Sequence, residues 1–507
     1  MKVGPKVANI ARQRRVRLIA SYALAIGLTV LGTMALCGQT TTPPGNVLYA
    51  SSFSGEDMGA KIANALADPR CSNGCVIYDG VAAGSSQSLN SQRNGIVFSR
   101  PVTLYLDGQY SYTGPAVPGG LFQIQSSGVR IIAGTYDHMG QTHRTGGAVI
   151  LAPTAIIYTP SSGTGPVFYF SNPSGSYNEG FELKGMEVVE DANVTNTVDF
   201  SGMLHGILLN TRILDNTITN SPYGSCPSGY VVYLNNTTNG PVADRITIAR
   251  NGDEDGVGCG QAGTNGGIYL ATQAQVGTPR IIGNYFQYLR NPFVHLDYAF
   301  DALIESNEVL LSHLPSGAGV FDFGPHWAHA ILIGNHIENP TANSTPNVYE
   351  VYVNAAGDYS IVGNTFGGGT LGMPDAPTYA IYDSGAKPAY FNIQNNFFAN
   401  LRGGAALYMA GAAHGSQFAN AFGSLKAYAT AQVLDPPGPS SKFGPTDAAG
   451  AQPTTFGSLP ACTSGNAGAV RFVSDSTTNL WGARISGGGR DHVLAYCDGA
   501  NWTVAGK

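Results

Sequence analysis

One ten-residue segment gathers residue types that can perform acid–base chemistry. FDFGPHWAHA, residues 321–330, contains an aspartate, two histidines and a tryptophan. Carboxylate and imidazole groups can exchange protons with a substrate, and an indole ring can pack against the C–H face of a sugar. The alternative is a loop whose histidines are only solvated. With two further acids in neighbouring stretches, the candidate catalytic residues are Asp297, Asp322, Asp383, His326 and His329.

Two of these acids have a spacing that suggests a catalytic pair. Asp322 and Asp383 each lie 13 residues before an asparagine of a repeated phrase, Asn335 and Asn396. If the intervening segments are regular, two strand spacings separate the carboxylates by about 10 Å. An inverting glycoside hydrolase keeps its two carboxyl groups about 6.5–9.5 Å apart, so the pair lies at the edge of that range. The alternative is two solvated surface carboxylates.

Aromatic residues recur in short apolar phrases such as GIYLA (267–271) and FVHLD (293–297). Strand alternation turns the flanking aliphatic residues inward and the central residue outward. A row of rings on a solvent-facing surface suits sugar binding, whereas the alternative is an internal aromatic stack. The predicted substrate-binding residues are Tyr233, Tyr269, His295, Trp327, Tyr352, Tyr382 and Tyr408, and the register of Phe321 is ambiguous.

A further group of acids lies in NGDEDGVGCG, residues 251–260. Carboxylate oxygens in a Gly-rich turn can coordinate calcium, so Asp253, Glu254 and Asp255 are candidate metal ligands. The alternative is a solvated loop. Ca²⁺ is the one cofactor that the sequence suggests, and no Cys/His spacing resembles a zinc site.

The elements that must position these residues are short repeated strands. The phrase ILIGNHI (331–337) recurs in variant form, with six intervals averaging 30 residues between the asparagines Asn216, Asn251, Asn284, Asn307, Asn335, Asn364 and Asn396. Two or three short strands per interval, with no amphipathic helix between them, exclude βαβ units and predict a parallel β-solenoid. Each asparagine is expected to adopt a left-handed bend and to hydrogen-bond to the asparagine of the next coil.

The first 36 residues differ from the remainder. Six basic residues precede an apolar run from Leu18 to Leu36, and no acidic residue occurs before Glu56. This layout predicts a secretory signal over residues 1–38 and a secreted, periplasmic or cell-surface protein. Two alternatives are a retained membrane anchor, because the run is long enough to span a bilayer, and a lipidated Cys37.

Charge and cysteines agree with export. The chain has 26 basic and 32 acidic residues, and without the six basic residues of the leader its net charge is about −12. Such a surface repels phosphate, so no nucleic-acid partner is expected. Six cysteines remain, and although six thiols permit fifteen connectivities, local pairing is favoured in an oxidising compartment. The expected pairs are Cys71 with Cys75, Cys226 with Cys259 and Cys462 with Cys497.

The coils I-x-x-N-x-[FIV], together with the opening FSGEDMGAKIANALADP (53–69), resemble the right-handed parallel β-helix proteins of the pectate lyase and polygalacturonase superfamily. The opening is similar to that of rhamnogalacturonase- and epimerase-type members, in which an amphipathic helix caps the first coil. Met58, Ile62, Ala65 and Leu66 fall on one helical face. The catalytic phrases of polygalacturonases and of calcium-dependent pectate lyases are not matched, so the resemblance implies the fold more than an activity.

The C-terminal region changes in composition. Residues 434–460 contain six prolines and are predicted to be a linker. Residues 461–507 resemble small β modules that end in Y-C-D-G-x-x-W on bacterial surface and phage-fibre-like proteins, and Trp481 and Trp502 there are either core residues or ligand platforms.

The predicted fold is therefore all-β, a right-handed parallel β-helix over residues 50–425 with an N-terminal helical cap and a small disulfide-linked C-terminal β module. The leading hypothesis for function is an exported lyase or glycoside hydrolase acting on a plant-type or acidic polysaccharide laid along the coils. The alternatives are a non-catalytic carbohydrate-binding or adhesin-like surface protein and a purely structural scaffold. No membrane partner is expected beyond the leader, and the sequence does not indicate an oligomeric state.

Overall fold

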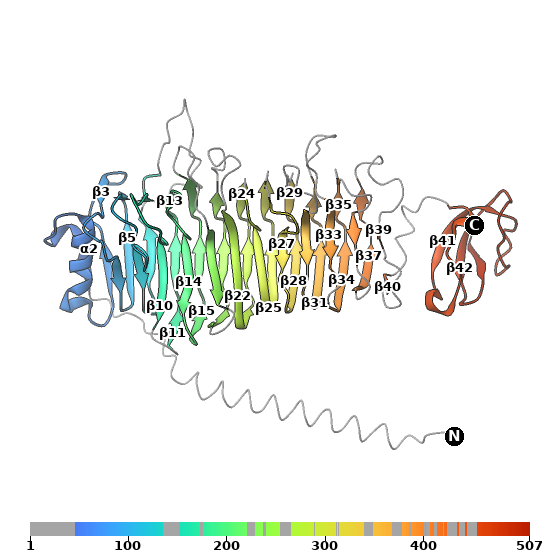
Figure 1. Ribbon diagram of the computed structural model, residues 1–507, viewed down its shortest axis with the longest axis horizontal. Coiled ribbons are helices and arrows are strands. Elements are labelled where there is room, and N and C mark those ends of the chain that lie inside the picture. The colour runs from blue at the N-terminus through green and yellow to red at the C-terminus, as the bar shows by residue number, and fades with distance from the viewer. Residues whose placement is uncertain are drawn as a thin grey trace, which may run out of the picture. The chain divides into compact units, whose positions relative to one another are not determined.

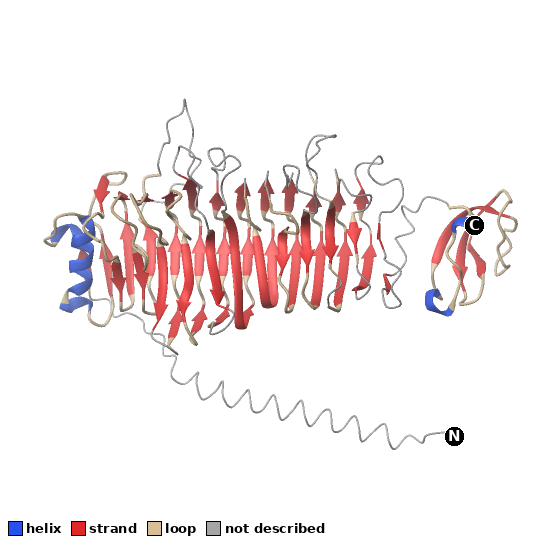
Figure 2. Ribbon diagram, viewed as in Figure 1, coloured by secondary structure: helices blue, strands red, loops and turns tan. Residues whose placement is uncertain are grey.

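The short strands of each repeat pair in parallel with the corresponding strands of the repeats before and after it. This stacking produces a β-solenoid of about ten turns. The structure is a computed structural model in which 52% of the described residues are strand and 6% helix, so the prediction of an all-β parallel β-helix is confirmed (Figure 1, Figure 2). It describes residues 46–134, 152–172, 176–220, 229–236, 240–253, 265–287, 289–310, 312, 314–338, 348–367, 378–384, 387–399, 401, 406–409, 413–418, 420–422, 433–434, 442–443 and 454–506.

A coil contains three strands, which we name in chain order after the three ladders that they build. In one coil the first ladder contributes β27 (Gly319–Phe323), the second ladder β28 (Ala328–Ile333) and the third ladder β29 (His336–Glu338). Two strands of 12 residues, β22 (Gly266–Gly277) and β25 (Val294–Glu305), continue around the bend between ladders. Three shorter strands, β11 (Tyr177–Glu179), β15 (Ile207–Leu209) and β19 (Val242–Asp244), pair in series up to β22 at the same bend.

The other strands extend these ladders on both sides. The first ladder also contains β4 (Ile96–Phe98), β7 (Phe122–Ile124), β10 (Phe168–Asn172), β14 (Val198–Met203), β18 (Tyr230–Asn236), β30 (Tyr349–Val353), β33 (Tyr379–Asp383), β36 (Leu407–Tyr408) and β39 (Val433–Leu434). The second also contains β1 (Val47–Tyr49), β2 (Cys75–Tyr78), β5 (Val102–Leu106), β8 (Arg130–Ala133), β12 (Glu182–Lys184), β16 (Arg212–Leu214), β20 (Thr247–Ala249), β23 (Arg280–Ile282), β31 (Gly357–Val362), β34 (Ala389–Gln394), β37 (Ala413–Phe418) and β40 (Lys442–Phe443). The third also contains β3 (Ser86–Ser88), β6 (Gln109–Tyr112), β9 (Ala155–Tyr158), β13 (Glu187–Glu190), β17 (Thr217–Asn220), β21 (Gly252–Asp253), β24 (Tyr285–Gln287), β26 (Glu308–Leu310), β32 (Thr365–Phe366), β35 (Phe397–Phe398) and β38 (Ala421–Phe422).

The solenoid interior is filled by rows of like apolar residues. Ile304, Leu332, Ile361 and Ile393 face one another on successive coils of the second ladder, and each is fully buried. Alternate residues of the same strands face outward, as the period of two requires. The outward positions of the first and second ladders are therefore where a ligand can reach the coils.

A helix closes the N-terminal end of the solenoid, as predicted. Helix α2 (Met58–Ala67) begins at the N-cap Asp57, whose side chain accepts a hydrogen bond from the amide of Ala60 at 2.9 Å. Its buried face consists of Met58, Gly59, Ile62, Ala65 and Leu66, which belong to the same core cluster as the coils (Figure 1). Among the helices that the structure describes, none is long and apolar enough to cross a membrane.

The asparagines form a continuous ladder of side-chain amides, which confirms the predicted hydrogen bonding between coils. Each Nδ2 donates to the Oδ1 of the next asparagine at 2.9–3.0 Å, from Asn216 to Asn420. The same Oδ1 also accepts the backbone amide of the preceding asparagine, and Nδ2 donates to a backbone carbonyl, as from Asn335 to Ile304 at 2.9 Å. Asn420 is an additional rung that the repeated phrase did not identify.

The predicted position of the left-handed bend is wrong by one residue. The positive φ falls on the residue before each of the seven predicted asparagines, for example Asp215 (58°), Gly334 (61°) and Asn395 (54°). Because each of these seven asparagines is buried and must turn its amide toward the neighbouring asparagines, the preceding residue makes the bend. Glycine and small polar residues tolerate that conformation best, although Arg250 also adopts it.

The C-terminal module is a three-stranded antiparallel sheet of β41 (Val470–Ser476), β42 (Asp491–Cys497) and β43 (Trp502–Gly506). Its small core contains Trp502, whose indole N–H donates to the carbonyl of Pro460 at 2.8 Å, whereas Trp481 is 79% exposed. The region predicted as a linker differs from expectation at both ends. β39 and β40 add to the solenoid, and residues from Thr454 onward pack with the module.

Two of the three predicted disulfides are confirmed. Cys71 and Cys75 are bonded with their Cα atoms 4.8 Å apart, and Cys462 and Cys497 with theirs 5.5 Å apart. The first bond follows the helical cap, and the second joins the strand β42 to the segment that precedes β41. Both pairs are local in the chain, as expected.

The third predicted disulfide, between Cys226 and Cys259, is not among the bonds of the described residues. Both Cys226 and Cys259 lie outside the described residues, so this pairing stays a prediction. The predicted leader, residues 1–38, also lies outside them, as do Glu254 and Asp255 of the candidate calcium site.

Candidate functional site

The predicted substrate-binding residues other than Trp327 occupy one outward row of the first ladder. Strand pairing aligns, coil by coil, Tyr233, Tyr269, His295, Asp322, Tyr352, Tyr382 and Tyr408. The ambiguous register is resolved, because Asp322 takes the row position and Phe321 is buried in the interior. A carboxylate therefore interrupts the aromatic row between His295 and Tyr352.

The rings in this row stack mainly on one another. The centroids of Tyr269 and His295 lie 4.2 Å apart with an interplanar angle of 10°, and those of Tyr382 and Tyr408 lie 4.7 Å apart with an angle of 14°. Tyr349, which precedes this row on its strand, stacks on Tyr382 at 4.2 Å. Burial raises the pKa of Tyr269 from its ordinary value of 10.0 to about 12, so its phenol stays protonated to higher pH than an exposed tyrosine. The row presents mostly ring edges and hydroxyl groups.

The prediction that Asp322 and Asp383 form an acid–base pair is wrong in its geometry. Asp322 aligns with Tyr352 and Tyr382 on the outward face, whereas Asp383 aligns with Val353 and is buried. The two carboxylates thus point to opposite faces of the sheet and cannot flank one glycosidic bond. Both aspartates lie 13 residues before an asparagine, but the bend before β34 is one residue longer than the bend before β28. Equal spacing in the sequence therefore places the two aspartates at different positions of their strands.

Two histidine–aspartate pairs instead join the coils of β25 and β27. His295 Nδ1 lies 3.3 Å from Asp322 Oδ1, and His326 Nδ1 lies 2.6 Å from Asp297 Oδ2. In one pair the histidine belongs to β25 and in the other the aspartate does. The structure therefore brings together four of the predicted residues, at the place where the chain leaves the first ladder.

The Asp297–His326 pair has the arrangement of an oriented acid–base group. The Asp297 side chain is only 4% exposed, and its Oδ1 accepts the backbone amides of Tyr298 at 3.0 Å and His326 at 3.1 Å. A carboxylate is acceptor-only, so Nδ1 of His326 carries the proton and donates it to Oδ2. Nε2 of the 40% exposed ring is then the basic nitrogen, and the buried carboxylate fixes its tautomer and orientation.

Gly324 makes the close approach of the two pairs possible. A Cβ at this position would lie 3.0 Å from Cβ and Cγ of Asp297 and 3.2 Å from Cε1 of His295. Both distances are shorter than ordinary van der Waals contact. Glycine therefore lets Asp297 and His295 both lie against the strand of the next coil.

Aromatic side chains surround His326. Its ring stacks on Tyr298 with centroids 4.0 Å apart, and Trp327 packs edge-on against Phe300 at 3.7 Å. Nζ of Lys387 donates to the backbone carbonyls of Pro325 and His326. Trp327, predicted to contact a substrate, thus lies beside the candidate acid–base group.

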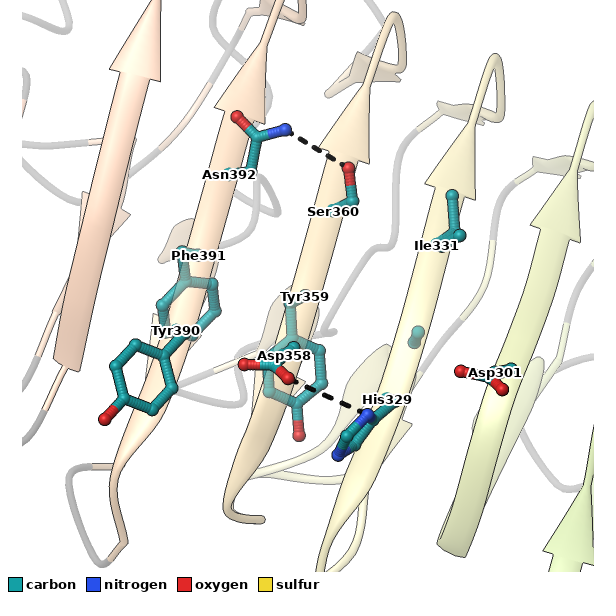
Figure 3. A pocket seen from close by; sticks show the side chains of 10 residues that line it. Asp301, His329, Ile331, Asp358, Tyr359, Ser360, Tyr390, Phe391 and Asn392 are labelled. Atoms are coloured by element: carbon teal, nitrogen blue, oxygen red, sulfur yellow. Dashed lines mark hydrogen bonds and ion pairs between the residues drawn. The ribbon is translucent and has the colours of Figure 1, made fainter. Parts of the chain in front are cut away.

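His329 lies in the strand that follows this segment, β28. Its Nδ1 is 3.7 Å from Asp358 Oδ2, and both side chains line a hollow of about 420 Å³ on the outer face of the second ladder (Figure 3). Trp327 and His329 are 6.0 Å apart between ring centroids. The hollow therefore begins at a histidine that lies next to Trp327.

Sequence reasoning missed several residues of this region: Tyr298, Phe300, Asp358, Lys387 and Tyr390. A usable signal was present in DYAFD (297–301), in which outward aromatic residues alternate with small ones directly after Asp297. The remaining three come from other coils, so only the stacking order of the coils reveals them. No group of three or more potential metal ligands occurs among the described residues, and the Asp253 side chain is outside that description.

No family model and no curated protein sequence matches the chain. A search of solved structures finds ORF18 of Geobacillus virus E2, which is 11% identical, with 91% of this chain and 76% of that chain covered and a TM-score of 0.31. A likeness this weak carries no inference about function.

Proposed function

We propose that this is an exported, polysaccharide-active protein of the β-helix type seen in the pectate lyase superfamily, with His326 as its acid–base group. The observation that supports this most is the Asp297–His326 pair, in which a buried carboxylate holds an accessible imidazole in one tautomer. Glycan cleavage by hydrolysis or by elimination needs such a group to move a proton. The neighbouring Trp327, Phe300 and Tyr298 supply apolar surface against which sugar rings can pack.

The experiment is incubation of the mature protein with a panel of polysaccharides, with and without Ca²⁺. New reducing ends would indicate hydrolysis, and absorbance of an unsaturated uronate would indicate elimination. Either product should form at least about 100-fold more slowly in His326→Ala and at the wild-type rate in His336→Ala, a matched histidine that is 44% exposed on β29. Binding without any product would exclude the enzymatic proposal.

A second candidate function, non-catalytic attachment to a glycan or surface, is favoured by the C-terminal module. Leu480 and Trp481 are 68% and 79% exposed, in a module whose other tryptophan is buried. An exposed Leu–Trp pair is unusual for a solvent-facing turn and is a suitable contact for a sugar or a protein surface. Retention of glycan binding by His326→Ala, combined with its loss in Trp481→Ala, would favour this function.

A further inference from the structure

The hollow beside His329 has a composition that restricts its ligand. It lies mainly across β28, β31 and β34, with one residue from β25, and the lining residues that bear on the ligand are Asp301, His329, Ile331, Asp358, Ser360, Tyr390 and Asn392. Figure 3 shows His329, Asp358 and Tyr390 side by side on successive strands, with Ile331, Ser360 and Asn392 in the next row along them. Three adjacent strands cover about 10 Å, which accommodates more than one sugar ring.

The lining combines apolar platforms with hydrogen-bonding groups. Tyr390 is 54% exposed and Ile331 is 41% exposed, so both present apolar surface to solvent. Between them, Asn392 Nδ2 donates to Ser360 Oγ at 3.4 Å. Sugars have this same division into C–H faces and hydroxyl edges, and pockets that bind them pair a ring with a few polar groups.

The charges of the lining are of one sign. Asp301 and Asp358 are exposed carboxylates of the lining, and none of the described residues that line the hollow is Lys or Arg. Carboxylates are acceptor-only groups that can take hydrogen bonds from sugar hydroxyl or ammonium groups. A uronate or sulfate placed here would meet two like charges, with only His329 able to offset them.

We propose that this hollow is a sugar subsite for a glycan without carboxylate or sulfate groups, and that it lies beside His326 because its lining residue His329 is next to Trp327. This inference rests on the proposed function and narrows its substrate class. Elimination requires a uronate carboxylate next to the carbon that loses its proton. For a glycan of the proposed class the reaction is therefore hydrolysis, in which water gives its hydroxyl to the anomeric carbon and a proton to the departing oxygen.

The test is affinity electrophoresis of the full chain in gels containing dextran, galactan, chitosan or polygalacturonate, all with EDTA. We expect retardation by at least one of the first three polymers and none by polygalacturonate. Tyr390→Ala should weaken the binding at least tenfold, whereas Tyr177→Ala, a tyrosine 57% exposed on β11, should not change it. The Asp301→Asn/Asp358→Asn double variant should gain measurable affinity for polygalacturonate, because the repulsion is removed while the amide oxygens remain.

The outcomes separate this inference from the proposed function. If polygalacturonate retards the wild type in EDTA and Tyr390→Ala abolishes that effect, the substrate class is wrong and the proposed function stands. Binding of an uncharged polymer that Tyr390→Ala leaves intact would overturn the subsite alone. Failure of all four polymers to bind would overturn both. Thermal unfolding followed by circular dichroism should show the same midpoint for each variant and the wild type, since the substituted side chains are exposed.

Discussion

Two contacts between coils differ in how often they occur. The asparagine turn recurs at every coil from Asn216 to Asn420, whereas the corner, by which we mean the Asp297–His326 pair before β28, occurs once among the described residues. In the turn, the side-chain amide of each asparagine donates its hydrogens to acceptors on neighbouring coils. The same hydrogen bonds therefore repeat wherever one coil stacks on the next. At the corner, His326 reaches back to Asp297 and the ring remains 40% exposed. The repeated polar contacts stabilise the solenoid, and the unrepeated ones are the candidates for chemistry.

The largest effect should follow from breaking the repeated turn. Asn335→Leu removes an acceptor for two donors of Asn307 and a donor to Ile304, all buried. Leaving several buried groups unsatisfied should lower the free energy of unfolding by about 3–6 kcal/mol. Hydrogen exchange should show the loss concentrated in the coils around β29, and denaturant unfolding should give its size.

Glycan binding by the folded fraction of Asn335→Leu should be unchanged, because the turn and the corner lie on different sides of the coil. A well-folded variant that no longer binds glycan would show that the asparagine turn participates in recognition.

The second effect concerns the corner. His326→Ala should lower the rate of glycan cleavage by about 100-fold or more, the usual contribution of a positioned acid–base group. Its unfolding temperature should also fall, because the buried carboxylate of Asp297 loses one partner, although two backbone amides still donate to its Oδ1. Asp297→Asn should also lower the rate, because an amide can donate to Nδ1 and favour the wrong tautomer. Initial rates of product release measure both. Equal losses in His326→Ala and in the control His336→Ala would contradict the assignment.

The aromatic row should give a smaller and different effect. Tyr382 stacks on Tyr349, Tyr352, Tyr379 and Tyr408, with centroid distances of 4.2–5.9 Å. Tyr382→Leu should therefore lower the free energy of unfolding by about 1–2 kcal/mol and leave glycan affinity unchanged. Denaturant unfolding and affinity electrophoresis distinguish these outcomes. Loss of affinity in a stable variant would show that this row, rather than the corner and the hollow, contacts the glycan.

The smallest effect depends on pH. Burial raises the pKa of the Glu350 carboxyl well above its ordinary value of 4.5, and the Gly367 amide offsets only part of this. Below pH 4.5 the carboxyl is protonated in both the folded and the unfolded protein. Above pH 4.5 it ionises in the unfolded protein but keeps its proton in the folded protein. The free energy of unfolding therefore falls as the pH rises toward the raised pKa. Glu350→Gln removes this loss and should stabilise the protein by about 1 kcal/mol at pH 7.

The stabilisation by Glu350→Gln should shrink toward zero as the pH is lowered to 4.5. Unfolding temperatures of variant and wild type across this range provide the measurement. A difference that does not depend on pH would mean that Glu350 is already ionised in the folded protein.

The sequence by itself determined the coils, the amide ladder, the helical cap and two disulfides. Each of these features depends on local spacing or on a phrase that repeats. A position that has the same contacts in every coil needs the same residue type in every repeat, so it can be recognised in the sequence. The apolar face of α2 is an example, since its helical period alone places Met58 and Ile62 together.

Only the tertiary structure decided which side chains meet across coils. Four residues separate β27 from β28 and five separate β33 from β34. The extra residue shifts the position of Asp383 in its strand by one relative to that of Asp322, and a shift of one turns a side chain to the other face. Asp383 is therefore buried, whereas Asp322 faces outward. The same stacking brought Asp297 to His326 and Asp358 to His329, because contacts between coils depend on bend lengths that no single repeat encodes.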